Sequence, residues 1–107
     1  MKTMMSLDGT QIVRVSDEKA SRLFGEGYRY VALSRDLLSR WGGPFEYGDY
    51  VVIEGTDGWD GIYQVRDTMN PKWVKRVDIL TTNSMFKYTD VKMYKYVKSN
   101  NDMVDNS

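Results

Sequence analysis

The chain has 107 residues, 41% of them hydrophobic and 13% aromatic, so it is long enough and apolar enough for one folded domain with a core. Its 15 basic and 15 acidic residues balance, which gives no support for the clustered basic face of a nucleic-acid-binding protein. Because cysteine and histidine are both lacking, the sequence excludes disulfides, zinc sites built on thiolate or imidazole, and Ser-His or Cys-His nucleophiles. Any acid–base chemistry therefore falls to carboxylates, lysines or tyrosines.

The two ends of the sequence carry little apolar patterning. The start, "MKTMMSLDGT", lacks the apolar stretch of a signal peptide, and no run in the chain is long enough to span a membrane. Residues 16–25 predict a short helix, with Ser16 as its cap and Gly25 as its end. The polar residues 99–107 predict a flexible tail after a single domain over residues 1–98.

The middle of the chain alternates between apolar runs and turn residues. "YRYVAL" predicts a strand, and "SRDLLSRWGG" predicts a second short helix from the Ser34 cap to Gly42, with Trp41 on its apolar, core-packed side. "GDYVVIEG" and "GIYQVRD" predict two strands around the tight loop "TDGWDG". In the second of these, period-two alternation places Tyr63 and Asp67 on one face.

Two further strands follow the break at Pro71. In "KRVDIL", Val77 and Ile79 face one way and Asp78 the other. "DVKMYKYVK" predicts an amphipathic last strand whose lysines form a solvated face. The residues alone thus predict a small, mainly β domain with one or two short helices.

Two aspartates, Asp67 and Asp78, stand eleven positions apart, with a turn-rich loop and a β-branched residue between them. In this spacing residues 28–80, and more weakly residues 91–97, resemble the double-psi β-barrel family. That family includes the rare lipoprotein A-like and three-aspartate domains, the lytic transglycosylase A core and the expansin catalytic domain. "EYGD" stands where the family has a "PLGT"-like turn, and Asp36 in "ALSRDLL" matches the third family aspartate.

The resemblance implies a six-stranded double-psi barrel. Family members begin with a strand before a "DGT"-like stretch, but here "LDGT" occupies residues 7–10. We therefore expect the first strand to be missing or shortened into residues 1–6. A missing strand leaves an open sheet edge, which a second copy of the chain or a partner protein would complete.

The resemblance also implies recognition or cleavage of peptidoglycan glycan strands. A lytic transglycosylase needs one carboxyl that first donates and then accepts a proton, with its pKa raised by burial or by a second carboxylate. On this hypothesis Asp67 is the acid and base, Asp78 perturbs and orients it, and Asp36 is a third wall. The structural alternatives are a turn cap for Asp67, a cross-strand ion pair for Asp78 and a helix first-turn acid for Asp36.

The same hypothesis assigns substrate binding to Trp73, Thr68, Asn70 and Tyr47. Trp73 lies in the loop between the two aspartates, where its ring could stack on the apolar side of a sugar; core or loop packing is the alternative for Trp73, as it is for Trp59. "DTMN" replaces the glycine-rich loop of the family, which changes how closely a substrate can approach the backbone.

No metal and no cofactor is expected. "DTMNPKWVKRVD" does not fit a calcium loop, because Met69 and Pro71 stand where oxygen ligands are needed. Two other functions stay open: a glycan-binding module that does not cut, and a structural subunit of a larger assembly such as a bacteriophage particle. The resemblance implies a place in the cell envelope, but the sequence has no signal peptide, so its localisation stays open, with a virion-associated or processed form among the alternatives.

Overall fold

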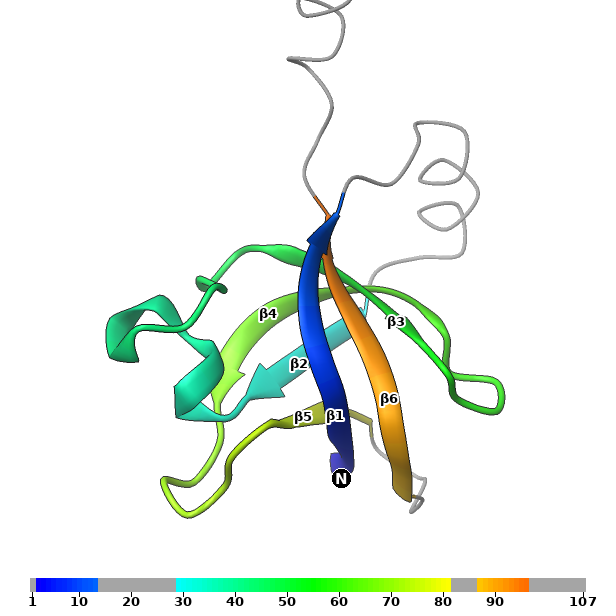
Figure 1. Cartoon of the computed structure of the whole chain (residues 1–107). Helices are drawn as coiled ribbons and strands as arrows, with labels where there is room; N and C mark the ends of the chain where they lie inside the picture. The colour runs from blue at the N-terminus through cyan, green and yellow to red at the C-terminus, as the bar shows by residue number, and fades with distance from the viewer. Residues whose placement is uncertain (1, 14–28, 82–86, 97–107) are drawn as a thin grey trace, which may run out of the picture.

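The computed structural model describes residues 2–13, 29–81 and 87–96, and for residues 2–13 only the backbone path. The predicted helix over 16–25 and the predicted tail over 99–107 lie outside the described residues. The fold is mainly β, as the sequence predicted, and Figure 1 shows the strands curling around a common interior.

The strands close into a barrel in the order β1-β5-β2-β4-β3-β6, and β6 pairs back with β1. Two pairs are parallel, β1 with β6 and β2 with β4, and the other pairs are antiparallel. The strands are β1 (Lys2–Val13), β2 (Arg29–Leu33), β3 (Tyr50–Glu54), β4 (Gly61–Thr68), β5 (Arg76–Leu80) and β6 (Lys87–Tyr96).

The chain itself supplies the first strand, which corrects the expectation of a missing or partner-supplied one. β1 is antiparallel to β5 over Lys2–Ser6 and parallel to β6 from Met4 to Val13. "LDGT" lies within β1 instead of after it. The register with β6 shifts between Leu7 and Thr10, so the Asp-Gly pair marks an irregularity inside a strand and not a turn.

The prediction of one short helix over residues 34–42 is also wrong. The segment forms two single 3-10 turns, η1 (Arg35–Leu37) and η2 (Ser39–Trp41). They are separated by Leu38, which is extended (φ −98°, ψ 141°) and makes a β-bridge to Phe45. This bridge takes Leu38 out of the helical path. Gly42 ends the segment in the left-handed region, as its sequence position predicted.

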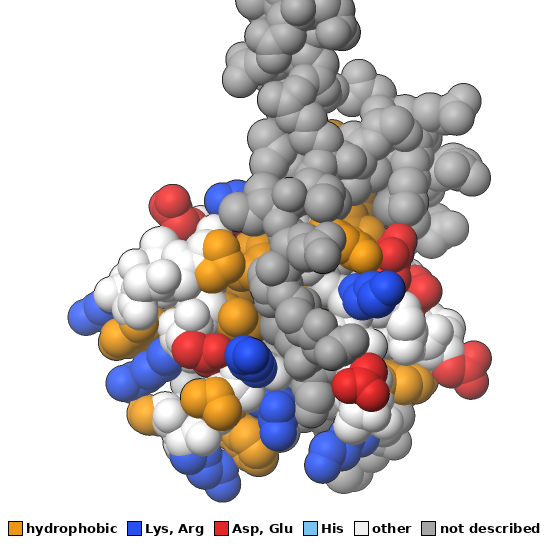
Figure 2. All heavy atoms as spheres, in the orientation of Figure 1, with side chains coloured by type: hydrophobic (Ala, Val, Ile, Leu, Met, Phe, Trp, Pro, Cys, Tyr) orange, Lys and Arg blue, Asp and Glu red, His pale blue; other side chains and the backbone are white. Residues whose placement is uncertain are grey.

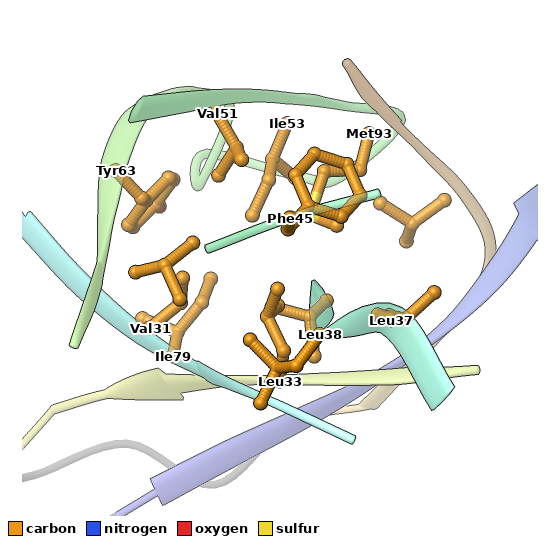
Figure 3. Packing of buried hydrophobic residues seen from close by; sticks show 13 residues of the cluster. Val31, Leu33, Leu37, Leu38, Phe45, Val51, Ile53, Tyr63, Ile79 and Met93 are labelled. Atoms are coloured by element: carbon orange, nitrogen blue, oxygen red, sulfur yellow. The ribbon is translucent and has the colours of Figure 1, made fainter. Parts of the chain in front are cut away.

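The barrel interior is filled from every described strand except β1, whose side chains lie outside the description. Val77 and Ile79 point inward from β5 as predicted, and Figure 3 shows Phe45 inside the barrel beside Ile53 and Met93. The fully or nearly fully buried members of this cluster are Val31, Leu33, Leu37, Leu38, Phe45, Val51, Ile53, Tyr63, Val65, Val77, Ile79, Val91 and Met93. Burial of these side chains is the main force that holds the barrel together.

Asp67 does not share a face with Tyr63 and Val65, contrary to the period-two prediction. Val65 is opposite Val31, but Asp67 is opposite Ala32, so β4 has one extra residue in this pairing. Such a bulge reverses the alternation that follows it. Asp67 therefore lies on the outer side of the sheet with Ala32, whose neighbours Val31 and Leu33 point inward.

Within the described residues, no helix is long and apolar enough to cross a membrane.

Candidate functional site

The candidate residues gather at the end of the barrel where the parallel strands β2 and β4 both finish (Figure 1, left). Three segments meet there: η1 and η2 after β2, the turn from Phe45 to Asp49, and the loop over residues 69–75 between β4 and β5. The Met69 amide donates to the Leu33 carbonyl (2.9 Å) and so fastens the β4–β5 loop to the end of β2. We call this part of the molecule the loop end.

Asp67 lies at the loop end with its carboxylate exposed to solvent. Its Oδ1 accepts the amide N–H of the next residue, Thr68, at 2.8 Å. The contact is local, as the turn-capping alternative predicted.

Asp78 is buried, with 4% of its surface exposed. It lies opposite Ala32 on β2, and Ala32 lies opposite Asp67 on β4, so the three residues form one row on the outer side of the sheet. We had expected the two aspartates to lie on neighbouring strands. Instead, β2 runs between β4 and β5 and separates them. Two strand spacings put their Cα atoms about 10 Å apart.

Asp36 has a structural contact of its own. Both carboxylate oxygens accept the Lys75 amide N–H, at 3.2 and 3.1 Å. Lys75 has a φ of 48°, a left-handed conformation that is unfavourable for a residue with a side chain. The Asp36 carboxylate thus stabilises a strained position in the β4–β5 loop.

The predicted substrate-binding residues also lie at the loop end. The Tyr47 hydroxyl and Thr68 Oγ1 are hydrogen-bonded, and 59% of the Tyr47 side chain is exposed. Asn70 organises the loop: its Oδ1 accepts the Lys72 amide (3.1 Å) and its carbonyl accepts the Trp73 amide (3.0 Å). Trp73 is half-buried. The structure therefore brings the six residues other than Asp78 to one accessible end of the barrel.

Sequence reasoning missed the cations at this end. The guanidinium carbons of Arg35 and Arg40 lie 4.9 and 5.2 Å from the ring centre of Trp41. Trp41 is 42% exposed, so its predicted core packing is wrong. Lys72 Nζ lies 4.9 Å from the ring centre of Trp73. In the sequence, these cations are visible as Lys and Arg residues concentrated in two separate segments. The net charge of zero for the whole chain hides this local concentration.

The opposite end of β4 is built differently. In the β3–β4 loop, Asp60 Oδ1 accepts the amide and hydroxyl of Thr56 at 2.8 and 2.6 Å. Trp59 packs against the core cluster, and its carbonyl accepts the Tyr63 hydroxyl. Burial raises the pKa of Tyr63 to about 12, with a smaller lowering by Arg29 and a smaller raising by Asp60. We call this part of the molecule the closed end.

No group of three or more Asp, Glu, His or Cys side chains that could hold a metal ion occurs among residues 29–81 and 87–96.

Comparison with known proteins gives no relatives. No family model matches the sequence, and no curated protein and no solved structure matches it either. The functional argument therefore depends on the site itself.

Proposed function

We propose that this protein is a double-psi-type barrel that binds peptidoglycan glycan strands at its loop end. The observation that carries the proposal is the convergence of Asp36, Asp67, Tyr47 and Trp73 on one accessible end of the barrel, although they come from three separate segments. Exposed aromatic rings with nearby carboxylates and amides suit a sugar, which has an apolar C–H face and a hydroxyl edge. Two parallel pairs between non-consecutive strands are in keeping with the crossing connections of such a barrel.

The geometry favours binding over cleavage. A carboxyl that protonates a glycosidic oxygen works best when it is partly buried or shares its site with a second carboxylate. Asp67 is exposed, and Asp78 is buried on a strand beyond β2. The two therefore lack the shared, water-poor cleft that the transglycosylase hypothesis requires.

The direct test is sedimentation with purified insoluble peptidoglycan. We expect the wild type to pellet with the polymer and Tyr47→Ala and Trp73→Ala to remain largely in the supernatant. Tyr30→Ala is the matched control, since Tyr30 is 43% exposed on β2 at the end away from Leu33. Wild-type protein that stays in solution would overturn the proposal.

The same samples separate binding from cleavage. Mass spectrometry of the soluble fraction should show no 1,6-anhydromuramyl products. If the wild type releases them and Asp67→Asn does not, the protein is a lytic transglycosylase with Asp67 as its acid and base.

A further inference from the structure

Two segments of the loop end carry an excess of positive charge, while the acids Glu46, Asp49 and Asp67 lie elsewhere at this end. Residues 34–42 and 69–76 together contain five Lys or Arg and one Asp, whereas the whole chain has 15 basic and 15 acidic residues. Two backbone-directed bonds join the segments: the Ser34 amide donates to the Arg76 carbonyl, and the Arg76 amide donates to Ser34 Oγ, both at 3.0 Å. The five cations with Trp41 and Trp73 make up what we call the cation–tryptophan face.

The two tryptophan rings gather these cations in pairs. Trp41 lies under Arg35 and Arg40, and Trp73 lies under Lys72 (4.9 Å) and Arg76 (5.8 Å). An aromatic face attracts a cation without neutralising its charge. The pairs are therefore held in place while their charge stays available to a ligand. Figure 2 shows Lys and Arg side chains interspersed with hydrophobic ones on this side of the molecule.

These cations have no carboxylate partner among the described residues. An ion pair at the loop end joins Lys95 to Asp49 (3.2 Å), and neither residue belongs to the cation–tryptophan face. The carboxylate of Asp36 is used by the backbone of Lys75 and not by a cationic side chain. The face therefore keeps an excess of positive charge.

Two donors of the face are also without acceptors. The Nε atoms of Arg35 and Arg76 are buried, and neither has a hydrogen-bond partner. A buried donor without an acceptor costs about 1–3 kcal/mol, so native proteins rarely keep one without a reason. Arg76 meanwhile holds the loop with another nitrogen, which donates to the Val74 carbonyl at 3.1 Å. Because both Nε atoms are out of contact with solvent, an external anion would be bound by the terminal nitrogens of these guanidinium groups.

We propose that the cation–tryptophan face binds the carboxylates of the glycan, namely the lactyl carboxylates of its muramic acid residues. The inference rests on the proposed function and adds the sugar that is selected: an acidic one in place of a neutral one. A planar guanidinium matches a carboxylate through two parallel N–H···O bonds, and the guanidinium groups of Arg35 and Arg40 lie beside the Trp41 ring. In a glycan strand whose stem peptides have been removed, every second sugar then presents a free lactyl carboxylate to the face; where the peptide is attached, that carboxyl is an uncharged amide.

The experiment titrates the full chain with two soluble probes of equal length. One is peptide-free peptidoglycan glycan with free lactyl carboxylates, and the other is the same glycan with those carboxylates amidated. We expect amidation to weaken binding at least about tenfold, and added salt to weaken binding of the acidic probe alone. Equal affinity for both probes would overturn this inference and leave glycan binding intact, whereas binding to neither would overturn the proposed function.

Variants locate the effect on the face. Arg40 is exposed and makes no backbone hydrogen bond within the described residues. The Arg40→Gln variant should therefore fold normally and lose affinity for the acidic probe only. Arg35→Lys keeps the charge but loses the fork, and we expect it to lose affinity at unchanged salt dependence. Lys92→Gln is the control, because Lys92 is exposed on β6 opposite Glu54, at the other end of β3. If Lys92→Gln weakens binding as much as Arg40→Gln does, the face is not the site.

Two further probes test for phosphate recognition. Single-stranded DNA and a poly(glycerol phosphate) chain are titrated under the same conditions. If either binds as tightly as the acidic glycan, the face recognises phosphate, and the assignment to muramic acid carboxylates is wrong.

Discussion

The two ends of β4 contain the same kinds of side chain but use them in different ways. At the closed end, Trp59 packs on the core, Asp60 caps its own loop, and Arg29 donates to the Asp60 carbonyl (3.4 Å). At the loop end, Trp41 is exposed, and the arginines beside it have no carboxylate partner in the part of the chain that the structure describes. The polar groups of the closed end are satisfied within the chain, and several at the loop end are not.

This difference separates structure from recognition. A tryptophan, an arginine and an aspartate that lie close together do not by themselves indicate a binding site, since the closed end has all three and uses them to stabilise the fold. Three features distinguish the loop end from the closed end within the described residues. They are exposed aromatic rings, cations without a carboxylate partner, and buried arginine Nε donors without acceptors. A substitution at one end can therefore be compared with a matched substitution at the other end.

The largest effect is expected from Gly43→Ala at the loop end. A Cβ on Gly43 would lie 2.3 Å from the Leu37 carbonyl carbon and 2.4 Å from the Asp36 oxygen, so the backbone must move. We expect the free energy of unfolding in urea to fall by about 3 kcal/mol, together with a loss of glycan binding. Gly58→Ala at the closed end has open space and only its φ of +91° as an obstacle, so it should cost about 1 kcal/mol. Equal costs would show that the two η turns are not packed as described.

Trp59→Ala and Trp41→Ala should have opposite consequences. Trp59 packs against the core, so its removal should lower the free energy of unfolding by about 2 kcal/mol and leave glycan affinity unchanged. Trp41 is 42% exposed, so its removal should change stability by about 0.5 kcal/mol or less and weaken binding. Urea unfolding and peptidoglycan sedimentation measure the two effects. A Trp41→Ala protein that binds normally would show that the exposed ring is not used.

Tyr63→Phe tests the closed end through pH. Loss of the hydroxyl leaves the Trp59 carbonyl without this donor, at a cost of about 1 kcal/mol near neutral pH. In the wild type the pKa of Tyr63 rises from 10.0 unfolded to about 12 folded, so its contribution is complete below pH 10 and is lost as the pH rises toward 12. The gap in unfolding free energy between wild type and Tyr63→Phe should therefore shrink over that interval. The exposed Tyr30→Phe variant is the control, and a gap that does not change with pH would contradict the burial of this hydroxyl.

Much of the barrel could be predicted because its strands bury alternate residues between clear turn signals. Val77 and Ile79 in β5 are the simplest case. The predictions fail where a pairing partner changes the local pattern. The bulge opposite Ala32 turns Asp67 outward, and the bridge from Leu38 to Phe45 replaces a helix with two turns. A single sequence contains no signal for either partner.

The candidate site shows the same division. The loop residues around Asp67 and Asn70 could be predicted to lie together because they are close in sequence. The position of β2 between β4 and β5 could not, and it separates Asp67 from Asp78. The cation–tryptophan face was missed because its two segments, residues 34–42 and 69–76, are far apart in the chain and the acids elsewhere cancel their charge.

The change that best separates the competing functions is Asp36→Asn. An amide oxygen still accepts the Lys75 N–H, so the free energy of unfolding should fall by about 1 kcal/mol or less. The substitution removes the acid that lies among five cations, so affinity for the acidic glycan should rise at low salt and return toward the wild-type value at high salt. Under the transglycosylase hypothesis, in which Asp36 lines a catalytic site, the same change would lower turnover and would not strengthen binding. Weaker binding by an Asp36→Asn protein of normal stability would therefore count against an electrostatic role for the loop end.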